Sequence, residues 1–108
     1  MFGDLFGLAG KIEKAKKEVA DARKRLAEMY IEKTSDDNKI RVRISADKTI
    51  HDIQIDPSFE GMSVDYLAGR LKALLNEAMD EANAIQEKEV KDALQRVLPD
   101  IPGLDKFF

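Results

Sequence analysis

Apolar residues recur at heptad spacing through the first 29 residues. The two seam positions of this repeat are occupied by Leu5, Ile12, Val19 and Leu26, and by Leu8, Ala15, Ala22 and Met29. Apolar side chains three and four residues apart share one face of an α-helix, so the repeat predicts an amphipathic helix over residues 5–29. Because alanine holds two of the four second positions, the narrow seam would make a weak dimeric coiled coil.

The period changes to two after Tyr30. Residues 39–45 alternate strictly between polar and β-branched side chains, which is typical of a strand with one face in water. Flanking strands are expected over residues 30–34 and 49–56, since the turn-forming run Ser-Asp-Asp-Asn at residues 35–38 separates the first strand from the second.

The second and third strands match as an antiparallel hairpin across a two-residue loop at Asp47 and Lys48. In this register Ile40, Val42 and Ile44 lie opposite Ile55, Ile53 and His51 on one face, while Arg43 meets Asp52 and Lys39 meets Asp56 on the other. A slip of one residue would turn every apolar side chain to water, so the agreement of both faces supports the hairpin. His51 is expected to be a partly buried or edge histidine.

A second helix is predicted over residues 64–97. Ser63 is a suitable N-cap, Asp65 follows in the first turn, and Pro99 forbids continuation. The expected core face comprises Val64, Leu67, Ala68, Leu71, Leu75, Ala78, Ala82, Ile85, Val90, Ala93, Leu94 and Val97. The chain is therefore predicted to be an α+β protein of helix, three-stranded antiparallel meander and helix, followed by a short apolar tail over residues 99–108.

Composition narrows the class of function. Charged residues make up 36% of the chain, and with no cysteine and one histidine it offers no disulfide, thiolate zinc site or cysteine nucleophile. No Gly-rich phosphate loop or Ser-His-Asp set can be assembled, and Glu77, Asp80 and Glu81 are expected to form a solvated face. We expect neither an enzyme nor a cofactor or small-molecule site.

Charge is unevenly distributed along the chain. The net charge of −3 opposes nucleic-acid binding. However, residues 1–48 carry 12 basic and 9 acidic side chains, a net of +3, whereas residues 49–108 carry 6 and 12, a net of −6. No apolar run approaches the roughly 20 residues of a membrane span, and the apolar start lacks the basic residues of a signal peptide, so a cytoplasmic location is expected.

The order of elements and several short motifs resemble the YbaB/EbfC family. The motifs are Met1-Phe2-Gly3 at the start, Val42-x-Ile44 leading into Ile53-x-Ile55-Asp56-Pro57, and an ending from Leu98-Pro99 to Pro102-Gly103. The chain departs from the family pattern at Asn38 and at Asp47 and Lys48, where glycines are usual. Its first helix is also rich in Lys and Arg where relatives often carry Gln and Met.

The resemblance implies a single domain over residues 1–108 that forms a tweezer-like homodimer. Such a dimer is expected to be nucleoid-associated and to bind double-stranded DNA with weak sequence specificity, affecting nucleoid organisation and gene expression. Phosphate contacts need positive charge at backbone spacing rather than base-edge geometry. The candidate DNA-binding residues are Lys11, Lys14, Lys16, Lys17, Arg23, Lys24 and Arg41.

Spacing along the first helix ranks these candidates. The expected ion pairs are Glu13 with Lys17, Asp21 with Arg25, Lys14 with Glu18 and Lys24 with Glu28. Lys11 and Arg23 have no acid three or four residues away along the helix, and Lys16 has only Glu13, so these three are the better candidates. Arg41 lies opposite Gln54 rather than an acid.

A protein-interaction module is the alternative function. The acidic second helix would repel DNA, and together with the apolar end at Phe107 and Phe108 it would suit docking onto a protein partner. The two functions differ in one measurable property, because phosphate-mediated DNA binding must weaken steeply with salt.

Overall fold

The structure, a computed structural model, describes residues 2–98, with side chains from residue 7 onward. Its elements are α1 (Phe2–Arg25), the short 3-10 helix η1 (Leu26–Glu28), β1 (Tyr30–Thr34), β2 (Ile40–Ser45), β3 (Ile50–Ile55), the 3-10 helix η2 (Pro57–Phe59) and α2 (Val64–Val97). The expected α+β order of helix, antiparallel meander and helix is confirmed. The expected apolar tail lies outside the described residues.

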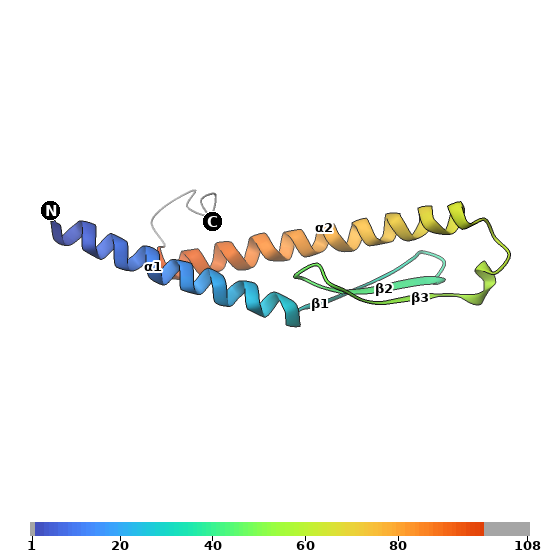
Figure 1. Cartoon of the computed structure of the whole chain (residues 1–108), viewed down its shortest axis with the longest axis horizontal. Coiled ribbons are helices and arrows are strands. Elements are labelled where there is room, and N and C mark those ends of the chain that lie inside the picture. The colour runs from blue at the N-terminus through green and yellow to red at the C-terminus, as the bar shows by residue number, and fades with distance from the viewer. Residues whose placement is uncertain (1, 99–108) are drawn as a thin grey trace.

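The molecule is a rod of 72 × 21 × 18 Å, with a helical arm at one end and a sheet at the other (Figure 1). The helical arm consists of α1 and the C-terminal part of α2, which packs on α1 through Val90, Ala93 and Leu94. The two helices run antiparallel, whereas the first half of α2 lies along the sheet (Figure 1). Each end has its own apolar core. The arm core is Ala15, Val19, Ala22, Val90, Ala93, Leu94 and Leu98, and the sheet core is built around Leu26, Ile31, Ile40, Val42, Ile44, Leu74, Ala78 and Ala82.

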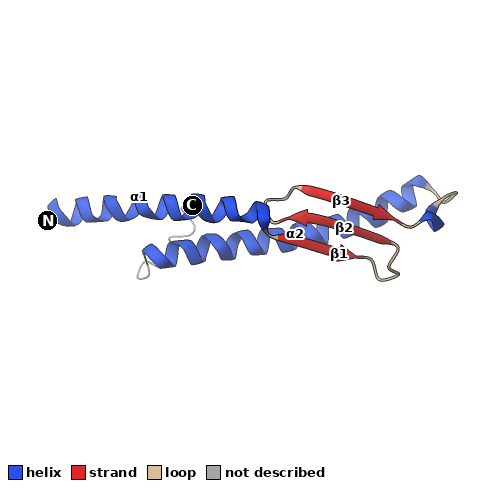
Figure 2. Cartoon of the chain, turned by 90° about the horizontal axis from the view of Figure 1, so that it is seen from below, coloured by secondary structure: helices blue, strands red, loops and turns tan. Residues whose placement is uncertain are grey.

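The heptad seam of α1 packs against α2 of the same chain. Ala15, Val19 and Ala22 are buried against α2, and Leu26 is buried in the sheet core. The α-helix ends at Arg25 rather than at residue 29, because η1 tightens the last turn and Met29 already has extended backbone. At the other end Leu8 is 42% exposed, since the first turns of α1 extend past the end of α2 (Figure 2).

The hairpin register is as predicted over most of its length. Ile40 pairs with Ile55, Val42 with Ile53 and Arg43 with Asp52, but Ile44 pairs with Ile50 rather than His51. The predicted two-residue loop was wrong. The backbone N–H of Ser45 donates to the carbonyl of Thr49 at 2.9 Å, which encloses a three-residue loop with Lys48 in the left-handed region at φ 69°. A loop of this kind produces a β-bulge, here between Arg43 and Ile44, and the bulge turns His51 away from the apolar face.

Helix α2 covers β1 and β2 and leaves β3 open. Every residue of β3 is exposed, although Ile50, Ile53 and Ile55 alternate toward the face that carries the core. The predicted core face of α2 was therefore partly wrong. Val64 is 80% exposed and Ala68 is exposed, whereas Leu74, which the pattern omitted, is buried. The prediction assumed that α2 packs against other apolar residues along its whole length, but the sheet contacts it only from about the second turn onward.

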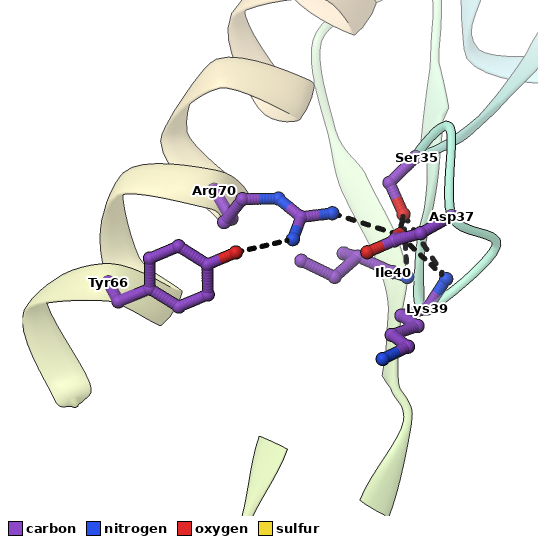
Figure 3. Close-up of polar contacts among 6 residues, drawn as sticks. All are labelled: Ser35, Asp37, Lys39, Ile40, Tyr66 and Arg70. Carbon is purple, nitrogen blue, oxygen red and sulfur yellow. Dashed lines mark hydrogen bonds and ion pairs between the residues drawn. The ribbon is translucent and has the colours of Figure 1, made fainter. Parts of the chain in front are cut away.

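A polar clamp joins the β1–β2 turn to the start of α2 (Figure 3). Arg70 Nη2 lies 2.9 Å from Asp37 Oδ1, and Arg70 Nη1 donates to the Tyr66 hydroxyl at 3.1 Å. The same carboxylate accepts from the Ser35 hydroxyl at 2.7 Å and from the Lys39 backbone N–H at 3.2 Å. The hydrogen bond from Ser35, followed by that from Arg70, lowers the pKa of Asp37 to about 2.

Asp37→Asn should destabilise the protein at neutral pH but not in strong acid. Because the folded pKa lies below the roughly 3.9 of an unfolded aspartate, the ionised clamp stabilises the fold above about pH 4, and this contribution is lost as the pH falls toward 2. Urea midpoints at pH 7 and pH 2.5 test this: the gap between wild type and variant should shrink at the lower pH. A gap of equal size at both pH values would contradict the role, and Asp36→Asn is the neighbouring control.

Candidate nucleic-acid interface

The basic residues predicted on the first helix all have exposed side chains on the helical arm. Because the seam turns Ala15, Val19 and Ala22 toward α2, the charged positions between them face water. The exposed side chains include Lys11, Lys14, Lys16, Lys17, Arg23 and Lys24. The structure thus brings six of the seven sequence candidates onto one element.

Ion pairing on the arm differs from the sequence prediction. Arg25 pairs with Glu89 and Glu18 pairs with Arg96, each at 3.9 Å and each between α1 and α2. Within residues 7–98, none of the four predicted i,i+4 pairs forms. Lys16 lies 3.9 Å from Glu13, one turn earlier. Because α2 runs antiparallel to α1, its side chains lie beside Arg25 and Glu18 and pair with them. Asp21 and Lys14, the partners predicted for these two residues, are therefore not used.

A groove of about 690 Å³ runs between the two helices of the arm. Its charged lining residues are Arg23 from α1 and Glu87, Lys88 and Lys91 from α2. Arg23 and Arg25 are two residues apart, which is about 200° around an α-helix, so the groove and the bridge from Arg25 to Glu89 lie on different sides of α1. Three cations and one carboxylate therefore line this groove, and a second carboxylate, Asp92, lies beside Lys88.

Lys88 and Lys91 are groove residues that the sequence prediction missed. They lie in the half of the chain with a net charge of −6, so counting charge by halves concealed them. Lys88 Nζ is 3.2 Å from Asp92 Oδ2 and its side chain is 75% exposed. One sequence signal could have found them. Val90, Ala93 and Leu94 form an apolar stripe on the second helix that can pack against the stripe of Ala15, Val19 and Ala22 on the first, and this packing brings Lys88 and Lys91 beside α1.

Arg41 is not brought together with the arm residues. It lies opposite Gln54, as predicted, and lines a separate hollow of about 310 Å³ with Lys39 and Asp56 near the β1–β2 turn. The expected ion pairs of Arg43 with Asp52 and of Lys39 with Asp56 do not form within the described part of the chain. Asp52 instead accepts from Gln54 Nε2 at 3.0 Å, and Asp56 accepts from the Ser58 backbone N–H at 2.8 Å.

Other kinds of site find no support in the part of the chain that the structure describes. No group of three or more potential metal ligands gathers there. No helix between residues 2 and 98 has the length and apolar character needed to cross a membrane.

Comparison with known proteins identifies the class. A model of a DNA-binding, non-enzymatic family matches residues 1–97, so the chain is a DNA-binding protein of α+β fold. It belongs to the YbaB/EbfC DNA-binding family.

Relatives support this assignment. A nucleoid-associated protein of Flavobacterium johnsoniae is 29% identical over 105 residues, covering 97% of this chain and 98% of that protein. A nucleoid-associated protein of Bordetella avium is 28% identical over 104 residues, covering 96% and 95%. The crystal structure of an uncharacterized protein from Helicobacter pylori is similar in fold, with a TM-score of 0.71 at 18% identity over 81% of this chain and 92% of that one.

Proposed function

We propose that the protein is nucleoid-associated and binds duplex DNA as a homodimer, through phosphate contacts from the helical arms and with weak sequence specificity. The observation that carries this proposal is the arm groove, in which Arg23, Lys88 and Lys91 converge from two helices. Duplex DNA presents one negative charge per about 1.7 Å of axis, so a line of cations along a rod can follow its backbone.

The net charge of −3 is compatible with this role because charge is unevenly placed: three cations and one carboxylate line the groove. Glu81 lies 2.9 Å from Lys33 on β1, and Glu89 and Glu18 pair across the arm. Each of these bridges neutralises one carboxylate and one cation, so together they leave the charge of the groove lining unchanged. The groove is therefore more positive than the average of the chain.

Salt dependence tests the phosphate mechanism. If two arms together contact about 6 to 10 phosphates, affinity for a duplex of mixed sequence should fall roughly 10³- to 10⁵-fold between 50 and 200 mM salt. Fluorescence anisotropy with two unrelated duplexes measures both the slope and the specificity. A flat salt response, or binding confined to one of the duplexes, would contradict phosphate-dominated contact.

The open face of β3 supports the homodimer. Ile50, Ile53 and Ile55 are 38–46% exposed and continue the apolar face of the sheet beyond the edge of α2. An exposed edge strand with an apolar face invites pairing with another chain. If a second copy packed the same residues against this face, both apolar patches would be buried in one symmetric interface. The resulting dimer would carry two helical arms.

Ile53→Asp is expected to convert the dimer into monomers. A carboxylate at this position would be buried against apolar side chains of the second copy, which costs several kcal/mol unless it is paired. Sedimentation velocity measures the change. Gln54→Asp, on the same strand but facing the other way, is the matched control and should remain dimeric; dissociation of both variants alike would place the interface elsewhere.

A protein-interaction module is the second candidate. Exposed Met62, two residues before α2, and exposed Val64 and Tyr66 in its first turn favour it, because these apolar side chains are remote from the arm groove. A dimeric protein that failed to bind DNA at 50 mM salt would favour this candidate over DNA binding.

A further inference from the structure

The outer face of the sheet, turned away from α2, carries a cluster formed by Tyr30, Arg43 and His51, one residue from each strand. In Figure 2 the three strands lie in front of α2, so this face of the sheet is uncovered by the helix. Tyr30 opens β1 five residues after the end of α1. The cluster therefore sits at the base of the helical arm.

Arg43 is held by an aromatic ring rather than by an acid. Its guanidinium carbon is 4.2 Å from the centre of the Tyr30 ring, which is itself 52% exposed. Glu32 and Asp52 flank Arg43 in the register, but neither forms an ion pair with it among the described residues, and Asp52 is engaged by Gln54. A stacked guanidinium keeps its N–H edge available for a bidentate contact with phosphate.

His51 is fixed beside the same ring. It meets Tyr30 edge to face with the ring centres 5.3 Å apart, and its Nε2 lies 2.9 Å from the Ser45 hydroxyl. That hydroxyl has one proton, which it donates to the Asp47 carboxylate, so Nε2 must be the donor in its bond with Ser45. The Nδ1 atom of His51 has no partner among the described residues.

The cluster is close to the arm groove through a direct contact. Gln86, which lines the groove, donates from Nε2 to the carbonyl of Ala46 at 2.8 Å. Ala46 follows Ser45, the residue that holds His51. The end of the groove and the base of the sheet are thus joined by one hydrogen bond.

We infer that Tyr30, Arg43 and His51 form a second nucleic-acid contact, in which Arg43 binds a backbone phosphate beyond the end of the arm groove. This inference rests on the proposed DNA binding and extends it from the helices to the sheet. Tyr30 acts as a positioning residue, because it orients the guanidinium without carrying charge.

Arg43→Gln tests the contact through the salt dependence of binding. At 0.1 M salt, affinity for a 25-base-pair duplex should fall roughly tenfold for each phosphate contact removed, and the slope of log K against log salt should become shallower by about 0.9 per contact. Lys72→Gln removes the same charge from an exposed position on α2 and should change neither value. Tyr30→Leu keeps the charge of Arg43 but removes the aromatic ring on which its guanidinium stacks. Affinity for the duplex should therefore fall a few-fold, while circular dichroism and the urea midpoint stay close to wild type.

Backbone and side-chain NMR shifts separate this inference from the proposed function. With unlabelled duplex added to the intact ¹⁵N-labelled protein, signals of Tyr30, Arg43 and His51 should move together with those of the arm. Movement of the arm signals alone, with Arg43→Gln binding as wild type does, would overturn the inference and leave the proposed function standing. Failure of the wild type to bind would overturn both.

Discussion

Lys91→Glu is expected to weaken binding to duplex DNA by about one order of magnitude per arm at 0.1 M salt. Lys91 lines the arm groove with Arg23 and Lys88, so in the proposed mode of binding its replacement both removes a phosphate contact and adds a repelling charge. The logarithm of the binding constant changes with the logarithm of the salt concentration by about −0.9 per phosphate contact. Relative to 1 M salt, losing one contact therefore lowers the affinity at 0.1 M salt by roughly eightfold. The double variant Arg23→Glu, Lys91→Glu should lose binding by roughly 10² or more.

The matched control is Lys72→Glu. Lys72 is an exposed lysine on the same helix, about 28 Å from Lys91 at 1.5 Å per residue, and the substitution changes the net charge by the same amount. Equal loss of affinity in the two variants would show that total charge, and not the groove, governs binding. Unchanged affinity in Lys91→Glu would remove the groove from the interface.

Ile44→Ala should lower the free energy of unfolding by about 2–5 kcal/mol. Ile44 is fully buried on the central strand, among Leu26, Val42 and Leu74 of the sheet core, so truncation leaves a cavity that a narrow sheet with one covering helix fills poorly. Urea unfolding at a fixed protein concentration measures the loss. Arg41→Ala, an exposed position on the same strand, should stay within about 0.5 kcal/mol of wild type; an Ile44 effect of that small size would contradict the assigned core.

The fold was predictable because each element has its own local signal. The heptad seam, the alternation of residues 39–45, the turn formers at residues 35–38 and the N-cap at Ser63 all act over a few residues. The turn formers predict the bounds of β1, and Ser63 together with Pro99 predicts those of α2. The errors arose where the outcome depends on another element. The bulge at Ile44 follows from the left-handed backbone of Lys48, and the exposure of Val64 follows from how far α2 overlaps the sheet.

The candidate site was only half predictable. Exposed lysines on α1 follow from its amphipathic pattern, but Lys88 and Lys91 join them only because two distant helices pack antiparallel. Ion pairing failed as a guide for the same reason. Glu18 and Arg25 have partners at i,i+4 spacing in the sequence, yet α2 places Arg96 and Glu89 beside them. Tertiary neighbours thus decide which charges remain available for DNA.

Because α2 is one continuous helix, a small rotation of its start on the sheet moves its far end in the arm by several ångströms. This one helix of 34 residues lies on the sheet at its start and forms half of the arm at its end, a span of about 51 Å at 1.5 Å per residue. Over that length, a rotation of about 5° at the sheet displaces the arm tip by roughly 4 Å, comparable to the 3.4 Å rise per nucleotide along one strand of DNA. In the proposed dimer, a small rotation where the two sheets meet would therefore change the gap between the arms by an amount comparable to that rise.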